Sequence, residues 1–356
     1  MIKYIGSKRM LLPTITGIVQ SLPGVRTVLD PFSGTARVGH ALKGLGYRVV
    51  ANDHNAYAAT LARCYVEADR DQVLAPAERL IAEFNRLPGR PGWFTATYAE
   101  RSRFFQPHNA ARIDAIRAAI AAKGLDPELE AVMLVSLMEA ADRVDSTTGV
   151  QMAYLKSWAP RAANDLELRV PVVLPRATQG KGRALELDAV EAARTEAADL
   201  VYLDPPYNQH KYLGNYHVWE SLVRWDKPEV YGTACKRVDC RSRRSAFNSR
   251  RSFATAFIDL LTAIKAPWIV LSFNDEGFLA REEAEASLAT RGSLTVIERD
   301  HPRYVGARIG ICNPAGEKVG RVGRLRNREY LYVVGPERVP AAVTAAAVPA
   351  GRLRVP

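Results

Sequence analysis

Short apolar segments alternate with helical stretches in this chain, and this alternation restricts the fold more than any other feature. Residues 25–29 and 47–51 have strand character, and helical stretches at 36–46 and 55–68 follow them. Strands that alternate with helices form a mostly parallel sheet, because parallel neighbours need a long crossover connection. The sequence therefore predicts an α/β fold with helices on both faces of the sheet. Further strands are expected at 183–187, 199–203, 268–273, 294–299 and 329–334.

The region 75–182 interrupts this alternation. Apolar residues recur there at helical spacing, as in 113–120 and 130–138, which predicts an inserted, mostly helical region. Residues 1–74 and 183–335 would then form the main domain. The Ala-, Pro- and Val-rich segment 336–356 shows little periodicity and is expected to be a mobile tail.

Composition excludes several classes of protein. The chain has 356 residues, of which 47% are hydrophobic and 24% charged, a balance typical of globular rather than disordered or fibrous proteins. It has no run of ~20 apolar residues, and its first residues do not resemble a signal peptide. The four cysteines are scattered, and Cys235 and Cys240 are spaced wrongly for a zinc pair. We therefore expect neither a metal site nor membrane association, and a reducing, cytoplasmic location.

The net charge of +11 is concentrated in two segments. Residues 227–251 contain eight basic and two acidic side chains, and residues 299–356 contain eleven and four. Excess positive charge attracts phosphate polymers or anionic membrane surfaces. The first segment is typical of a phosphate-facing loop, although a solvated basic loop is the alternative. The second flanks a predicted strand and carries less weight. The candidate phosphate contacts are Lys211, Lys236, Arg237, Arg241, Arg243, Arg244, Arg250 and Arg251.

The first predicted strand runs into a turn, Asp30-Pro31-Phe32-Ser33-Gly34. A glycine-bearing turn between a strand and a helix places a ligand at the carboxyl edge of a sheet. The turn is not a P-loop, because His40 stands where lysine is needed, and it lacks the G-x-G-x-x-G pattern. A carboxylate at the strand tip disfavours a pyrophosphate and suits a cationic ligand, such as the sulfonium and ammonium groups of S-adenosylmethionine.

The second predicted strand ends in Asn52-Asp53, and Asp53 lies 19 residues after Gly34. An acidic residue at this place can accept hydrogen bonds from ribose hydroxyls. Each loop alone is compatible with an ordinary turn followed by a helix cap. Together they favour a cofactor that contains adenosine.

The segment Asp204-Pro205-Pro206-Tyr207 follows the apolar strand 199–203 and is the most specific motif in the chain. An aromatic amine such as adenine N6 is a poor nucleophile, because its lone pair is delocalised into the ring. Two acceptors, the Asp204 carboxylate and the Pro205 carbonyl, would favour the localised form of the amine and offset developing charge. Tyr207 can stack on the base, which must first be flipped out of a duplex. Methyl transfer is then an in-line displacement governed by positioning.

Three motifs, at 4–9, 30–35 and 204–207, resemble in content and order those of the Dam-like (alpha-group) N6-adenine DNA methyltransferases. The resemblance implies a Rossmann-like class I methyltransferase sheet, S-adenosylmethionine as cofactor and double-stranded DNA as substrate. It also implies that the main domain is catalytic, that 75–182 contributes to target recognition, and that Lys8 lies near the methionine carboxylate. The implied catalytic residues are Asp204, Pro205, Pro206 and Tyr207, and the implied cofactor-binding residues are Tyr4, Gly6, Ser7, Lys8, Asp30, Pro31, Phe32, Ser33, Gly34, Asn52, Asp53 and Asp188.

The function predicted is site-specific methylation of adenine N6 in DNA, for restriction-modification or epigenetic marking, with a cognate restriction endonuclease as a possible partner. The alternatives are methylation of cytosine N4 in DNA, methylation of adenine in RNA, and a catalytically inactive DNA-binding relative. Asp204 favours adenine, since serine at that position would favour cytosine. A nicotinamide dehydrogenase is disfavoured by the missing glycine pattern. The recognition sequence and the oligomeric state stay open.

Overall fold

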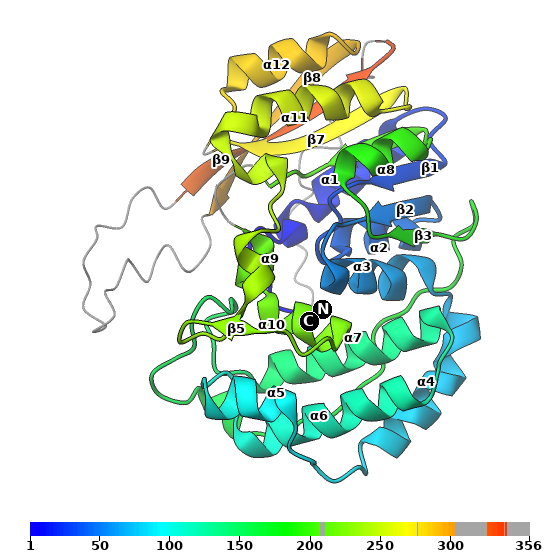
Figure 1. Ribbon diagram of the computed structural model, residues 1–356. Coiled ribbons are helices and arrows are strands. Elements are labelled where there is room, and N and C mark those ends of the chain that lie inside the picture. Colours follow the sequence, from blue (N-terminus) through cyan, green and yellow to red (C-terminus); the bar gives the residue numbers. More distant parts are fainter. Residues whose placement is uncertain (207–210, 276, 303–325, 338, 340–356) are drawn as a thin grey trace.

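The computed structural model of the protein describes residues 1–206, 211–275, 277–302, 326–337 and 339. These residues form a central sheet with helices on both faces and a further helical layer beyond one end of it (Figure 1). The sheet has seven described strands in the order β3-β2-β1-β4-β7-β9-β8. Their bounds are Thr27–Asp30 (β1), Arg48–Asn52 (β2), Arg183–Leu185 (β3), Leu200–Leu203 (β4), Trp268–Asn274 (β7), Ser293–Pro302 (β8) and Arg326–Gly335 (β9).

The strand order fixes where a ligand site can form. β1, β2, β3, β4 and β7 pair in parallel, whereas β9 runs antiparallel to both β7 and β8. From β1 the chain builds outward through β2 and β3, and it then returns to place β4 on the other side of β1. At such a switch point the connections leave in opposite directions, which opens a crevice at the carboxyl ends of the two strands. The loops after β1 and β4 therefore meet there.

Successive side chains of the strands enter two separate hydrophobic cores. Val28 and Val49 belong to one core, and Leu29 and Val50 belong to the other, as the two-residue period of a strand requires. The first core contains residues of α1 (Leu12–Ser21), α2 (Arg37–Gly44) and α3 (Ala56–Ala62), which continues into a π-helical turn at Arg63–Glu67. The second contains residues of α8 (Ala189–Thr195), α11 (Arg250–Ala263) and α12 (Arg281–Ala289).

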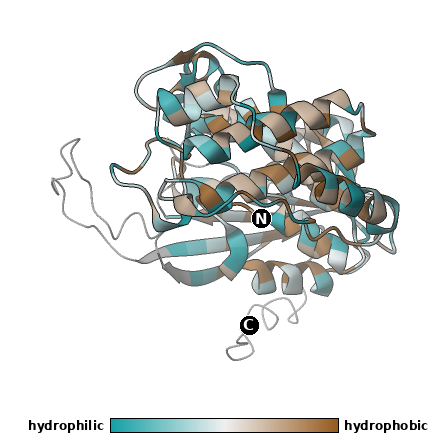
Figure 2. Ribbon diagram, turned by 90° about the horizontal axis from the view of Figure 1, so that it is seen from below, coloured by the Kyte–Doolittle hydropathy of each residue, from teal (hydrophilic) through white to brown (hydrophobic). Residues whose placement is uncertain are grey.

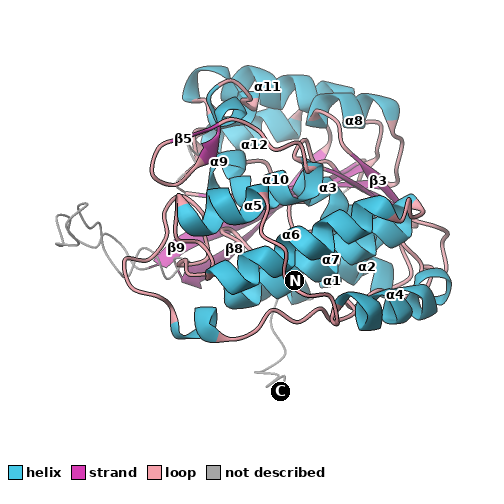
Figure 3. Ribbon diagram, turned by 60° about the horizontal axis from the view of Figure 1, so that its bottom comes forward, coloured by secondary structure: helices cyan, strands magenta, loops and turns pink. Residues whose placement is uncertain are grey.

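The helical layer consists of α4 (Arg70–Phe84), α5 (Trp93–Thr95), α6 (Pro107–Ala122) and α7 (Pro127–Val144). α6 and α7 lie in front of the strands in Figure 3, and α7 packs against α4 and the turn that continues α3. Figure 2 shows apolar and polar residues on the same helices, the pattern of half-buried helices. The first core extends from the sheet into this layer without interruption.

Two short helices, α9 (Tyr212–Asn215) and α10 (His217–Arg224), connect the carboxyl edge of the sheet to the helical layer. The strands β5 (Val230–Tyr231) and β6 (Lys236–Arg237) form a separate small hairpin after them. No helix in the described part of the chain is long and apolar enough to cross a membrane.

The predicted α/β fold with a mostly parallel sheet and helices on both faces is confirmed. All seven expected strands are present, with ends shifted by a few residues. The antiparallel direction of β9 was not predicted, because strand character in a sequence carries no information on direction. α4 begins at Arg70, before residue 75, where the sequence predicts the inserted region to start. Apart from residues 336, 337 and 339, the predicted tail lies outside the described residues.

Candidate active site

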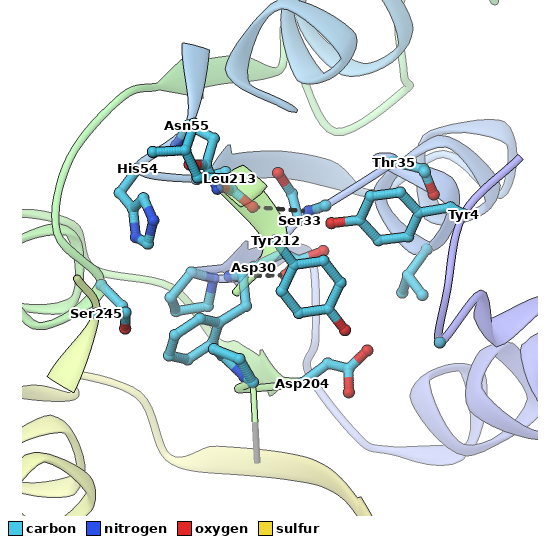
Figure 4. A pocket seen from close by; sticks show the side chains of 18 of the residues that line it. Tyr4, Asp30, Ser33, Thr35, His54, Asn55, Asp204, Tyr212, Leu213 and Ser245 are labelled. Atoms are coloured by element: carbon cyan, nitrogen blue, oxygen red, sulfur yellow. Dashed lines mark hydrogen bonds between the residues drawn. The ribbon is translucent and has the colours of Figure 1, made fainter. Parts of the chain in front are cut away.

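A pocket opens at the carboxyl ends of β1, β2 and β4, where the switch point places it. All three sequence motifs contribute to its wall, although they lie far apart along the chain (Figure 4). Of the predicted cofactor-binding residues, those that line it are Tyr4, Gly6, Ser7, Lys8, Asp30, Pro31, Phe32, Ser33, Gly34, Asp53 and Asp188. Asp204 and Pro206 of the predicted catalytic loop also line it.

The turn after β1 is held by hydrogen bonds to carboxylates. The Phe32 amide donates to Asp30 Oδ1 at 3.2 Å, and the Gly34 amide donates to Asp53 Oδ2 at 3.1 Å. Gly34 has a φ of +50°, and a Cβ there would lie 3.3 Å from the ring of Tyr4. Glycine is favoured at this position for its left-handed conformation and for the close approach of Tyr4.

Asn52, also predicted to bind the cofactor, is fully buried and does not line the pocket. Its side-chain amide donates to the carbonyls of Pro31 and Leu187, and its Oδ1 accepts from the Leu187 amide. Asn52 thus links the end of β2 to the segments that follow β1 and β3. Asp53, which follows it, projects Oδ1 toward the backbone amide of Asn55 at 2.9 Å and remains in the pocket wall.

The pocket is lined by four carboxylates and four basic side chains, those of Asp30, Asp53, Asp188 and Asp204 and those of Lys8, Arg37, Lys211 and Arg243. Burial, together with the nearby charge of Asp204, raises the pKa of Asp30 well above its ordinary value. Burial also raises the pKa of Asp53, and it raises the pKa of Asp204 to about 6. Desolvation and like charges both disfavour ionised carboxylates. A ligand with positive charge in this pocket would relieve that cost.

The Asp204 carboxylate sits at the end of β4 in an ion-pair chain. Lys8 Nζ lies 3.1 Å from Asp204 Oδ1 and 3.6 Å from Glu329 Oε2. Lys8 and Glu329 are buried. Lys8 therefore lines the pocket as expected, but its ammonium group faces these two carboxylates. Tyr207, the last residue of the predicted catalytic loop, lies outside the described residues.

The aromatic rings of Tyr4 and Tyr212 also line the pocket. Tyr4 stacks on Tyr212 with ring centroids 5.3 Å apart and on Tyr216 with centroids 4.6 Å apart. In Figure 4 the rings of Tyr4 and Tyr212 lie on the same side of the pocket as Asp204. Such rings offer flat, apolar surfaces for a planar heterocycle.

Several buried polar atoms of the lining residues have no hydrogen-bond partner among the described residues. They are Ser33 Oγ, Arg37 Nε, Asn55 Oδ1 and the Tyr202 hydroxyl. Buried polar atoms in folded proteins are normally paired. The pocket thus combines unpaired polar atoms, carboxylates and stacked aromatic rings. This combination fits a ligand that carries hydroxyls, a planar ring and positive charge.

The basic residues predicted to contact DNA fall into different environments. Arg237 is buried, and its guanidinium pairs with Asp226 at 2.7 Å and Asp239 at 3.1 Å. It is therefore not placed to meet a phosphate. Arg243 and Lys211 line the pocket. Lys236 is half-buried, and the exposed residues are Lys211, Arg241, Arg244, Arg250 and Arg251.

The sheet order and the pocket at its carboxyl edge are consistent with a Rossmann-like methyltransferase. A sequence profile of the D12 class N6 adenine-specific DNA methyltransferases matches residues 4–268, and the chain belongs to this family. The family predicted from the three motifs is thereby confirmed.

Individual relatives agree with this assignment. Modification methylase StsI of Streptococcus sanguinis is 31% identical over 297 residues, covering 79% of this chain and 45% of that protein. Type II methyltransferase M.NlaIII of Neisseria lactamica is 28% identical over 313 residues, covering 85% and 92%. Type II methyltransferase M.FokI of Planomicrobium okeanokoites is 29% identical over 309 residues, covering 82% and 47%. The chain thus spans about half the length of StsI and M.FokI and most of M.NlaIII.

Sequence reasoning missed several residues in the pocket and one beside it. Glu329 on β9 does not line the pocket but lies 3.6 Å from the lining residue Lys8, and no motif surrounds it. Tyr212 is an aromatic residue close behind the catalytic loop, which is a signal that could have found it. The remaining lining residues that were not predicted are Thr35, Arg37, Val38, His54, Asn55, Ala189, Tyr202, Leu213, Ser245 and Asn248.

Proposed function

We propose that this protein transfers the methyl group of S-adenosylmethionine to N6 of a flipped-out adenine in duplex DNA. The observation that carries the proposal is the meeting of Asp204 with Asp30 and Asp53 in one pocket at the switch point of the sheet. The Asp204 carboxylate, which can accept a hydrogen bond from an amine, thereby lies beside a site that suits a nucleoside with positive charge. Membership of the N6 adenine-specific family supports the choice of adenine.

The residues of the pocket fit S-adenosylmethionine. Asp53 and the unpaired Asn55 Oδ1 offer acceptors for ribose hydroxyls, and Asp30 offers negative charge for the sulfonium or ammonium group. Gly6 and Gly34 leave room beside Tyr212 and Tyr4, since a Cβ at either position would lie 3.2 to 3.3 Å from a tyrosine. When bound, this cofactor supplies an electrophilic methyl group.

The protein's own part is to position and polarise the adenine amine. Lys8 holds Asp204 in place by their ion pair. The carboxylate accepts a hydrogen bond from the amine, and the Pro205 carbonyl accepts the second, so that the lone pair localises on nitrogen. The proline ring fixes the backbone at this point. No strong general base is needed, because the proton becomes acidic as the methyl group is gained.

The test is incubation of the protein with labelled S-adenosylmethionine and mixed duplex DNA, followed by mass analysis of the nucleosides. N6-methyladenine is the expected product, and Asp204→Ala serves as the inactive control. If N4-methylcytosine formed instead, the substrate base would be cytosine. If product formed on RNA alone, the substrate would be RNA rather than DNA. Absence of label on every substrate would contradict the proposed activity.

The names of the relatives, modification methylase and type II methyltransferase, suggest a role in a restriction-modification system. A cognate endonuclease would then be the biological partner. We place target recognition in 75–182 and DNA-phosphate contacts among the exposed arginines of 227–251. Methylation-sensitive sequencing of DNA from a host that expresses the chain would give the recognition site.

A further inference from the structure

The carboxylate of Glu220 on α10 is fully buried and lies next to the turn that follows Asp53. Its Oε2 accepts from the amide of Tyr57 at 3.1 Å, and its Oε1 accepts from the amide of Ala56 at 3.3 Å. Arg224, one helical turn later, donates to Oε1 at 2.7 Å. Glu220 thus holds the first residues of α3 to α10.

Arg243 completes this cluster from the basic loop. Its Nη1 donates to Glu220 Oε1 at 2.8 Å, and its Nη2 donates to the carbonyl of His54 at 2.9 Å. Burial raises the pKa of Glu220, but the hydrogen bonds from Arg243 and Arg224 outweigh it and leave the pKa below its usual value. Glu220 is therefore ionised, and charge-assisted hydrogen bonds of this kind are the strong ones.

The guanidinium of Arg243 consequently joins α10 to the His54–Asn55 turn, which borders the pocket. His54 and Asn55 line the pocket next to Asp53, and Arg243 lines it as well. Asp53 in turn depends on this turn, because its Oδ1 accepts from both the amide and the side chain of Asn55. The chain of contacts runs from Glu220 through Arg243 to the carboxylate expected to face the ribose.

The next residue, Arg244, is a natural contrast. It is exposed, and its Nε donates a long hydrogen bond of 3.4 Å to the carbonyl of Arg241. Two neighbouring arginines of the same basic segment therefore face opposite environments, one toward buried carboxylate and pocket, the other toward solvent.

We propose that Arg243 is a positioning residue for the cofactor, which acts through Glu220 and the His54–Asn55 turn, and that it is not a DNA-phosphate contact. This inference rests on the proposed function, because it takes the pocket to be the S-adenosylmethionine site. The basic segment then has two roles: Arg243 sets cofactor affinity, and the exposed arginines contact DNA.

The experiment compares Arg243→Ala, Arg243→Lys and Arg244→Ala in the full chain by calorimetric titration with S-adenosylhomocysteine, which binds without turnover. Arg243→Ala should weaken the Kd about tenfold, because a bidentate charged contact is lost. Arg243→Lys keeps the charge but reaches one partner only, so a loss of about threefold is expected. Arg244→Ala should leave this Kd unchanged.

DNA binding gives the second readout. The slope of log K against log salt should fall by about one in Arg244→Ala and stay constant in both Arg243 variants. Equal cofactor affinity in all variants, or a reduced slope in the Arg243 variants, would overturn the inference. The lysine variant decides the matter if the alanine variant does not fold. Failure of the wild-type protein to bind S-adenosylhomocysteine would instead contradict the proposed function.

Discussion

The pocket carboxylates Asp30 and Asp53 and the basic segment 227–251 differ in how their charges are compensated. Within the described residues, neither Asp30 nor Asp53 has a lysine or arginine within ion-pair distance, and burial raises the pKa of both. In the basic segment, by contrast, Arg237 pairs with Asp226 and Asp239, and Arg243 pairs with Glu220.

The difference shows which charges serve the fold and which await a ligand. Burying an unpaired charge is costly, whereas a buried pair with satisfied hydrogen bonds is tolerated. Uncompensated carboxylates in a pocket therefore indicate a cationic ligand. Compensated arginines, however basic the segment around them, stabilise the structure and are not available to phosphates.

The largest effect is expected for Asp204, whose carboxylate we propose accepts a hydrogen bond from the adenine amine. Asp204→Ala removes an acceptor that acts in the transition state, so kcat should fall by about 10³-fold or more. Cofactor affinity should change much less. Asp204→Asn, which keeps a carbonyl acceptor without the charge, should retain more activity than the alanine variant. Single-turnover kinetics and a cofactor titration measure both quantities, and an alanine variant with wild-type kcat would contradict the mechanism.

A smaller effect is expected for Asp30, whose charge we take to be complementary to the cofactor. Asp30→Asn keeps the acceptor for the Phe32 amide and removes the negative charge. Affinity for S-adenosylmethionine should fall by about thirtyfold, since nearby opposite charges are worth ~2 kcal/mol in a partly buried site. Affinity for S-adenosylhomocysteine, which lacks the sulfonium charge, should fall less. Equal losses for the two ligands would mean that Asp30 does not recognise the sulfonium.

The pH dependence tests the charge state of Asp204. Burial raises its pKa to about 6, and the acceptor must be deprotonated, so activity should rise with pH through this value and level off above it. At one pH unit below the midpoint the rate should be about tenfold lower than the plateau. Glu329 adds to the raised pKa, so Glu329→Gln should move the midpoint to lower pH. An unchanged midpoint in this variant would show that Glu329 does not influence the pKa of Asp204.

The fold was predictable because local patterns fix it. Apolar strands followed by helices require a parallel sheet, and Asp30, Asp53 and Asp204 at strand ends predict where the ligand lies. The role of Arg243 and the position of Glu329 were not predictable, since each depends on contacts between residues far apart in the chain. The basic residues of a sequence can be counted, but the tertiary structure decides which of them form ion pairs with a partner such as Glu220.

The smallest effect separates the two kinds of arginine in the basic segment. Arg244→Ala should weaken DNA binding about threefold at moderate salt and reduce the salt slope by about one, because one exposed phosphate contact is lost. Arg237→Met is the matched control: its guanidinium is buried between Asp226 and Asp239, so the salt slope should not change. The methionine variant should instead melt at lower temperature, because two carboxylates lose their partner. A reduced salt slope in the Arg237 variant, with an unchanged melting temperature, would show that its ion pairs open to bind DNA, and the division between compensated and available charge would then fail within this segment.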